Sequence, residues 1–158
     1  MKEKMASDSK IVMSQIMLPS QANPAGNIHG GELMKIMDSA AYAVARRHAQ
    51  SNVVTARVDE LEFHLPIFVG ELVTCSAEIV FTGTSSMEVA VRVEVDDLDD
   101  DLGPKKAQTA FFTMVAIDKK GNPSPVPKLI IQTDEEKVAF EEGKKRYEYY
   151  KKKKINRN

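Results

Sequence analysis

The sequence predicts an α+β fold in which one long helix packs against a curved, mostly antiparallel sheet of about five strands, followed by a separate C-terminal helix. Apolar residues recur at spacings of three and four in one long segment, which is typical of a helix. Later segments alternate between apolar and polar residues or are apolar throughout, as strands are. A single helix buries only one face of a sheet, so the remaining apolar surface favours an oligomer.

The predicted elements follow one another in a simple order. A short strand covers Ser9 to Met17, and an irregular loop rich in Pro, Gly and Asn leads from Leu18 to Gly31. The long helix covers Gly31 to His48, and its apolar stripe is Leu33, Met37, Ala40, Ala41 and Val44. The other strands are expected at Val53 to Ile67, Glu71 to Phe81, Met87 to Val95 and Ala107 to Ile117. We expect the whole chain, residues 1–158, to form one domain.

The patterns within the strands predict which side chains are buried. From Val53 to Ile67 the apolar phase slips near Asp59, which indicates a β-bulge. The next strand has one apolar face made of Val73, Cys75, Ala77, Ile79 and Phe81. The strand after it has one wet face, which carries Glu88, Arg92 and Glu94. Ala107 to Ile117 is apolar on both faces and is expected to lie inside the sheet.

The C-terminal segment, from residue 133 to about 153, predicts a charged helix. Thr133 and Glu136 have the spacing of a capping box at its start. A narrow apolar stripe favours docking on the domain or on a partner subunit, and it consists of Phe140, Gly143, Tyr147 and Tyr150. The basic run Lys151 to Lys154 is expected to be a solvated helix face.

Composition limits the classes of protein. With 42% hydrophobic and 28% charged residues the chain is an ordinary globular one. Its formal net charge of −1 gives no general attraction to nucleic acid or to an anionic membrane. We expect neither a signal peptide nor a membrane span, because no apolar run approaches the roughly 20 residues that a span needs. Cys75 is the only cysteine, which excludes an internal disulfide and favours a reducing compartment, the cytoplasm.

Several familiar chemistries have no signal in the sequence. The chain lacks a G-x-S-x-G elbow, a G-x-x-x-x-G-K-[ST] phosphate loop and a G-x-G-x-x-G dinucleotide turn. His29, His48 and His64 have no metal-ligand spacing with one another or with Cys75. Cys75 itself is expected to be a small buried hydrophobe. Serine, cysteine and zinc catalysis are therefore poorly supported.

The stretch NPAGNIHGGELMKIMD places a carboxylate, Asp38, beside the apolar stripe of the helix. Asp38 shares a helix face with Met34, Ala41 and Ala45. One interpretation is that Asp38 points to solvent at the margin of the stripe. The other is a partly desolvated carboxylate that takes a proton from water or attacks a carbonyl directly.

The start of the same helix carries two further signals. Gly30 and Gly31 stand where Ser, Thr or Asp would be the usual cap. Either the free N–H groups form an oxyanion site, or the two glycines simply make a flexible junction between the loop and the helix. Asn23 offers an amide N–H that polarises a carbonyl, or it makes a turn. Together these residues and Asp38 supply a base, a carbonyl polariser and an oxyanion donor within sixteen positions.

Asn23, the run His29-Gly30-Gly31 and Asp38, in this order, resemble the active-site stretch of hot-dog-fold acyl-CoA thioesterases. The segment ARVDELEFHLPIFVGELVTCSAEIVFTGTSSMEV is similar to the strands that follow it in the cytosolic acyl-CoA hydrolase branch of that family. EEGKKRYEYYKKK resembles the tail helix of the same branch. The likeness extends from about Met17 to Lys153.

The resemblance implies a hot-dog fold, in which the sheet wraps the long helix and pairs into a homodimer whose two sheets run on. It implies that dimers assemble into a hexamer, as a trimer of dimers. The implied reaction is hydrolysis of a fatty acyl-CoA to free acid and CoA, with no metal or organic cofactor and with neither nucleic acid nor membrane as a partner.

The resemblance also implies roles for single residues. Asp38 is the general base or the nucleophile, Asn23 is the partner amide, and the N–H of Gly31 or Gly30 is the oxyanion donor. In the family the Asn and Asp side chains meet across the dimer interface. The implied substrate-binding residues are His29, Arg57, Gly83, Thr84, Ser85 and Ser86, with Lys105, Lys106 and the tail lysines as alternatives to Arg57 for the CoA phosphates.

Some members of the family have a hydroxyl on the strand after the helix that orients the attacking water. An ungapped count puts Ala56 at that position, so Thr55 takes the role only if the register differs. Two other functions stay open on the sequence. One is a regulatory module that binds acyl-CoA without turnover. The other is a hot-dog hydratase or dehydratase, which needs a His paired with an acidic group, and no such motif surrounds the three histidines.

Overall fold

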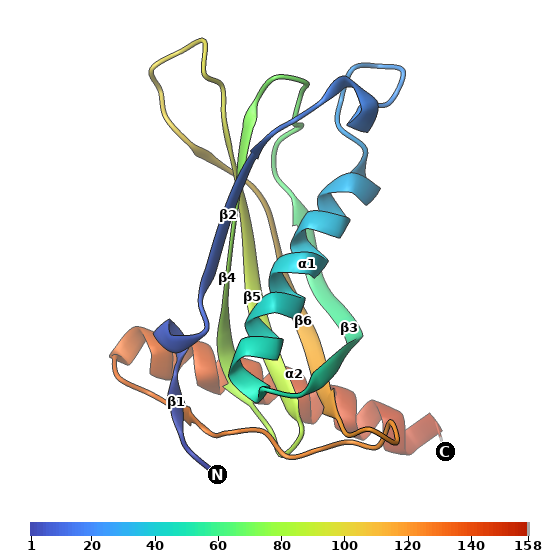
Figure 1. The fold of residues 1–158 in the computed structure, drawn as a ribbon, viewed down its shortest axis with the longest axis vertical. Coiled ribbons are helices and arrows are strands. Elements are labelled where there is room, and N and C mark those ends of the chain that lie inside the picture. Colours follow the sequence, from blue (N-terminus) through green and yellow to red (C-terminus); the bar gives the residue numbers. More distant parts are fainter. Residues whose placement is uncertain (158) are drawn as a thin grey trace.

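Within residues 1–157, which the computed structural model describes, five strands form one antiparallel sheet around a long helix, α1 (Gly30–Ala49) (Figure 1). The strands lie in the order β2-β4-β5-β6-β3, so β2 and β3 are the edges. Their bounds are β2 Ile11–Ile16, β3 Asn52–Phe63, β4 Leu72–Thr82, β5 Ser86–Asp96 and β6 Lys105–Ile117. We call the face that packs against α1 the inner face of the sheet and the opposite one the outer face.

The main core fills the space between α1 and the inner face. The predicted stripe of α1 is buried there, and the inner positions of β5 and β6 meet it with Met87, Val89, Phe112 and Met114, all fully buried. This packing confirms the predicted α+β fold and the predicted internal position of β6. The helix starts at Gly30 rather than Gly31 and ends one residue after His48.

The end of α1 is fixed by local backbone geometry and by the N-terminal segment. Gln50 adopts a left-handed conformation, with φ 54°, and its N–H donates to the Arg46 carbonyl at 2.8 Å. Lys4 donates from Nζ to the His48 carbonyl at 2.8 Å, which places a cation at the negative end of the helix dipole. Lys4 belongs to a short strand, β1 (Lys4–Met5), that pairs in parallel with β7 (Leu129–Ile130). Two short 3₁₀ helices, η1 (Ala6–Asp8) and η2 (Pro19–Gln21), flank β2.

Register shifts occur in the pairings of β3 with β6, β4 with β5 and β5 with β6, and those in β3 and β4 bear on the predicted faces. In β3 the pairing with β6 shifts between Thr55 and Arg57 and again between Asp59 and Glu62, and the second shift confirms the slip predicted near Asp59. In β4 the shift lies between Ile79 and Phe81. It turns Phe81 to the outer face, so the prediction that Phe81 shares the apolar inner face with Ile79 is wrong.

The C-terminal helix, α2 (Asp134–Arg157), crosses the outer face behind the lower end of the sheet (Figure 1). The Glu136 N–H donates to the Thr133 hydroxyl at 3.0 Å, as the predicted cap requires. Phe140 and Tyr147 pack on Phe81, with ring centroids 5.0 and 5.3 Å apart. Of the two docking partners that the sequence left open, α2 thus contacts the sheet of its own domain.

α2 also buries Glu88, which the sequence placed on a wet face. The Glu88 side chain is only 4% exposed, and Arg146 of α2 binds it through both carboxylate oxygens, with Nη2 2.7 Å from Oε1. The prediction of a wet face was wrong for Glu88 because alternation in one strand does not reveal which helix covers it. No helix within residues 1–157 is both long enough and apolar enough to span a membrane.

Candidate active site

Asp38 on α1 and Thr55 on β3 face each other at the margin of the core. The Thr55 hydroxyl donates to Asp38 Oδ1 at 2.7 Å, and its oxygen lies 3.4 Å from the sulfur of Met114. Asp38 and Thr55 are both exposed residues. The pair therefore presents a carboxylate that is held at one oxygen by a hydroxyl and open to a water or a substrate at the other.

Thr55 faces inward because residues 52–55 pair in regular register with β6, and a bulge follows at Ala56. Thr55 pairs with Met114, whose side chain is in the core, whereas Arg57 pairs with Thr113, the next residue on the opposite face. Ala56 is the extra residue between them. The ungapped count pointed to Ala56, so the structure corrects it: the hydroxyl beside Asp38 belongs to Thr55. The alternation of β3 from the buried Val53 puts Thr55 on the same face, and this was the sequence signal that could have found it.

The single chain does not desolvate Asp38, which one of the two interpretations of the sequence requires. Asp38 lies at the margin of the apolar stripe, as its position in the helix predicts, but the single chain leaves it exposed. A partly desolvated carboxylate would need a cover from a second subunit or from a bound substrate.

Asn23 is fixed in the loop before α1 by a turn of its own making. Its Oδ1 accepts hydrogen bonds from the N–H groups of Ala25 and Asn27, at 3.0 and 3.1 Å. The turn role that the sequence left open is therefore present. Because the oxygen is used in the turn, the amide Nδ2 is the group left to donate outward, and it makes no hydrogen bond within residues 1–157.

The N-terminus of α1 has free donors and free space. His29 is the N-cap residue and makes no side-chain cap, and the N–H groups of Gly30 and Gly31 donate to no acceptor within residues 1–157. A Cβ added at Gly31 would have no neighbour within 4 Å, and one at Gly30 would meet only Phe63, at 3.9 Å. Neither a positive φ nor close packing within this chain requires glycine at these two positions.

Asn23 and Gly30 line one pocket of about 360 Å³, together with Phe63 and His64 at the end of β3. The structure thus brings the predicted amide and the predicted oxyanion donor together. Asp38 does not line this pocket, and no hydrogen bond joins Asp38 to Asn23 within residues 1–157. One chain therefore carries the two halves of the predicted site at separate places.

The predicted substrate-binding residues lie in different surroundings. Gly83 and Thr84 line a larger pocket, of about 850 Å³, which also has Lys128 and Lys151 on its wall. Ser85 and Ser86 complete the same hairpin. The backbone carbonyl of Ser85 accepts from the Ala116 N–H, and that of Ser86 accepts from the Gly83 N–H, both at 2.9 Å. His29, Lys105 and Lys106 are exposed.

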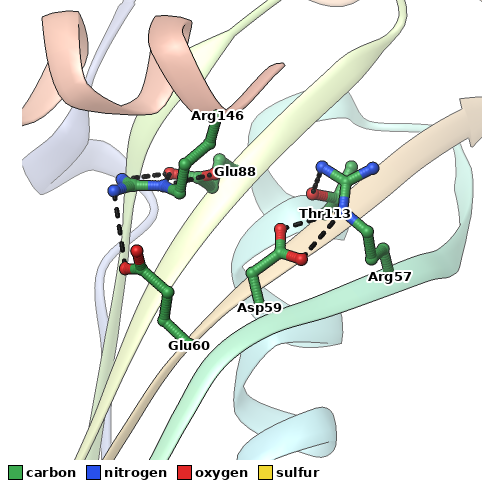
Figure 2. A network of polar contacts seen from close by, with 6 residues as sticks. All are labelled: Arg57, Asp59, Glu60, Glu88, Thr113 and Arg146. Carbon is green, nitrogen blue, oxygen red and sulfur yellow. Dashed lines mark hydrogen bonds and ion pairs between the residues drawn. The ribbon is translucent and has the colours of Figure 1, made fainter. Parts of the chain in front are cut away.

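Arg57, a candidate for binding the CoA phosphates, contacts side chains of its own chain. Its Nε donates to both carboxylate oxygens of Asp59, at 3.0 and 2.9 Å, and its Nη2 donates to the Thr113 hydroxyl at 3.2 Å (Figure 2). Its guanidinium carbon lies 3.7 Å from the ring centroid of Tyr150 on α2. These contacts hold Arg57 on the outer face, where it lines a pocket of about 420 Å³ with Tyr150 and two of the tail lysines, Lys153 and Lys154.

Other titratable groups do not contribute to the site. Burial raises the pKa of the Cys75 thiol to about 12, as expected for a buried hydrophobe rather than a nucleophile. Within residues 1–157 no three His, Cys, Asp or Glu side chains are grouped as metal ligands.

These features define a class: a single long helix wrapped by a five-stranded antiparallel sheet, with a carboxylate on the helix and free N–H groups at its start. The model of the thioesterase superfamily matches residues 25–100. A solved hexameric acyl-CoA thioesterase superposes with a TM-score of 0.89 at 35% identity, covering 97% of each chain. The chain belongs to the thioesterase superfamily and has its hot-dog fold, as the sequence predicted.

Two members of the family are similar to this chain over most of its length. The cytosolic acyl coenzyme A thioester hydrolase of Mus musculus is 45% identical over 130 residues, 82% of this chain, but the chain spans only 34% of that relative. The acyl-CoA hydrolase of Staphylococcus aureus, solved in complex with butyryl-CoA and CoA, has a TM-score of 0.88 at 33% identity and covers 98% of this chain, which covers 93% of it. Alanine variants of the S. aureus enzyme at an aspartate, an asparagine and a threonine have also been solved.

Proposed function

We propose that this protein hydrolyses fatty acyl-CoA thioesters to free fatty acid and CoA, in sites that two subunits share. The observation that carries the proposal is the 2.7 Å hydrogen bond from Thr55 to Asp38, which aligns a carboxylate whose second oxygen is open. Thioester hydrolysis needs an activated water and donors for a tetrahedral oxyanion, and this chain has candidates for both.

In the proposed reaction Asp38 takes a proton from a water whose oxygen attacks the thioester carbonyl carbon. The oxyanion that forms accepts hydrogen bonds from the N–H of Gly31 or Gly30, while Asn23 Nδ2 polarises the same carbonyl. Collapse of the intermediate breaks the C–S bond, and the CoA thiolate takes the proton from Asp38. Asp38 as a nucleophile would instead attack the carbonyl carbon, and the C–S bond would break to release the CoA thiolate, which takes a proton from solvent. Water would then open the resulting anhydride to give the free acid and restore the Asp38 carboxylate.

The open edge of β3 supports a shared site. Within residues 1–157 β3 pairs only with β6, and it leaves Val54 45% and Phe63 62% exposed. Unpaired strand edges favour pairing with another chain. An antiparallel two-fold pairing would set the Phe63 end of one β3, beside Asn23, against the Thr55 end of the other, beside Asp38. The two halves of the site would then meet across the interface.

The spacing of the three side chains is a second line of support. Asn23, Asp38 and Thr55 are separated by fifteen and seventeen positions. The asparagine, aspartate and threonine replaced in the S. aureus acyl-CoA hydrolase have the same two spacings. In this proposal Thr55 therefore joins the predicted residues and orients Asp38 or the attacking water.

The same proposal extends to assembly, substrate binding and location. We infer dimers that assemble further as a trimer of dimers, because a neighbouring thioesterase is hexameric. The hairpin Gly83 to Ser86 and the lysines near it are the proposed contacts for CoA, with His29 near the helix start. We propose a cytoplasmic location, since Cys75 is the only cysteine, and a reaction without metal or organic cofactor.

The test is release of free thiol from acyl-CoAs of graded chain length by the purified full-length protein, with and without a chelator. We expect steady turnover of at least one chain length, unchanged by the chelator, and slower turnover of a short acyl pantetheine that lacks the nucleotide. No release from any acyl-CoA, together with measurable binding, would leave the regulatory module as the function. Loss of activity in the chelator would overturn the metal-free reaction.

A further inference from the structure

A cluster on the outer face of the sheet lies directly behind the Asp38–Thr55 pair. Figure 2 shows its two parts, one around Arg57 and Asp59 on β3 and the other around Glu88 and Arg146. Asp59 is 5% exposed and pairs with Arg57, and Tyr150 of α2 covers the Arg57 guanidinium at 3.7 Å. The cluster thus joins α2 to the strand that carries Thr55.

The Ala56 bulge couples this cluster to Thr55. In a regular strand positions 55 and 57 would point to the same face, since side chains alternate with a period of two. Here Thr55 points inward to Asp38 and Arg57 points outward to Asp59 and Tyr150, which is possible only while Ala56 is the extra residue. A one-residue slip that removed the bulge would turn one of the two side chains to the wrong face.

The contacts hold Arg57 from three directions. Its Nε donates to Asp59, its Nη2 donates to Thr113 of β6, and the Tyr150 ring stacks on its guanidinium. The bond to Thr113 fixes the register of β3 on β6 at the position next to the bulge.

We infer that Arg57, Asp59 and Tyr150 are positioning residues, through which α2 holds the β3 bulge so that the Thr55 hydroxyl stays aimed at Asp38. This inference rests on the proposed hydrolysis, in which Thr55 and Asp38 act on the reacting water. The three side chains lie on the face of the sheet opposite to the Asp38–Thr55 pair. Their effect on the rate is transmitted by the backbone of Thr55 and Ala56.

The experiment compares Tyr150→Ala with Tyr150→Phe in the full chain. The phenyl ring preserves the stacking on Arg57 and lacks only the hydroxyl beside Asp59, so Tyr150→Phe should lose much less kcat than Tyr150→Ala. Loss of the ring in Tyr150→Ala should lower kcat about tenfold while KM stays within about twofold, because misplacement of a group by about 1 Å is costly only in the transition state. A folded Tyr150→Ala protein with wild-type kcat would overturn the inference.

A double-mutant cycle separates positioning from general weakening of the fold. In a Thr55→Val background there is no hydroxyl left to aim, so Tyr150→Ala should cause little further loss of kcat. An equal loss in both backgrounds would show that the helix acts on the enzyme in some other way and would overturn the inference.

A second pair of variants tests the inference if Tyr150→Ala does not fold. Arg57→Gln combined with Asp59→Asn removes both charges without leaving one of them buried alone, and it should lower kcat as Tyr150→Ala does. The matched control is Arg92→Gln with Glu94→Gln, an exposed pair at the same spacing on β5, 3.4 Å apart, which should keep wild-type kcat. Equal losses in both double variants would contradict the inference. A wild-type protein without thioesterase activity would overturn the proposed function itself, and this inference with it.

Discussion

Thr55 and Asp38 lie seventeen positions apart in the sequence and are joined by a 2.7 Å hydrogen bond between β3 and α1. Hydrogen bonds to an ionised carboxylate are stronger than those between neutral groups, so this bond fixes the Asp38 side chain on the helix surface. The same bond ties the open edge of the sheet to the helix, close to where a second subunit would pair.

Replacing Asp38 by Asn keeps the size and the hydrogen bond from Thr55 but removes the base. We expect kcat of Asp38→Asn to fall by about a hundredfold or more, the range of general acid–base catalysis, with the fold intact by circular dichroism. Thr55→Val should lower kcat less, with Thr55→Ser as its active control. Most of the activity surviving in folded Asp38→Asn protein would return Asp38 to the role of a surface carboxylate.

Mixing subunits tests whether Asn23 and Asp38 of one site come from different chains. Neither Asn23→Ala nor Asp38→Ala alone can then form a complete site, but a mixed dimer has one site with both lesions and one with none. Random reassortment of equal amounts makes about half of the dimers mixed, so roughly a quarter of wild-type activity should return.

The mixed dimers must be verified, for instance by co-expression of the two variants with different affinity tags and sequential purification. Verified mixed dimers with no more activity than the single variants would show that each site is built from one chain.

Arg146 should contribute to stability because it neutralises a buried carboxylate. Burial raises the pKa of Glu88, although the facing guanidinium opposes this effect. Arg146→Leu would leave Glu88 buried without a counter-charge and should lower the free energy of unfolding at pH 8 by about 3–5 kcal/mol. In the folded variant Glu88 would hold a proton that it releases in the unfolded chain. The loss of unfolding free energy relative to the wild type should therefore shrink as the pH falls towards the ordinary pKa of a glutamate.

Urea unfolding at pH 8 and at pH 5 measures both effects. Arg92→Leu is the matched control, since its ion pair with Glu94 is exposed and should change stability by no more than about 0.5 kcal/mol. A deficit of Arg146→Leu that stays constant with pH would contradict this account of Glu88.

His48 should make the protein less stable in mild acid. Burial lowers the pKa of His48, and its Nε2 lies 2.7 Å from the Pro127 carbonyl, which a neutral Nε2–H ring can use as acceptor. The unfolded chain binds the proton more readily, so the free energy of unfolding should be highest above about pH 6.5 and should fall as the pH drops below it. His48→Gln, which keeps a donor, should remove most of this slope between pH 7 and 5. A slope equal to that of the wild type would assign the acid sensitivity to other groups.

The chain's own patterns determined the main elements. The helical spacing from Leu33 to Val44 and the alternation of β5 identify elements whose buried faces follow directly from local periodicity. The order of Asn23, the two glycines and Asp38 identified the candidate stretch, because amide, free N–H groups and carboxylate are chemical types that can be read without a structure. That the two halves of the site meet across a subunit interface remains a hypothesis.

Only the tertiary structure decided which face each residue occupies where periodicity breaks. The opposite faces of Thr55 and Arg57 depend on a bulge, which is a property of the pairing between β3 and β6 and not of β3 alone. The burial of Glu88 and the engagement of Arg57 depend on α2, which lies 58 and 93 positions away at Arg146 and Tyr150 and meets them only in the folded chain. Local sequence sets the period of each element, whereas contacts between distant segments set its register and its cover.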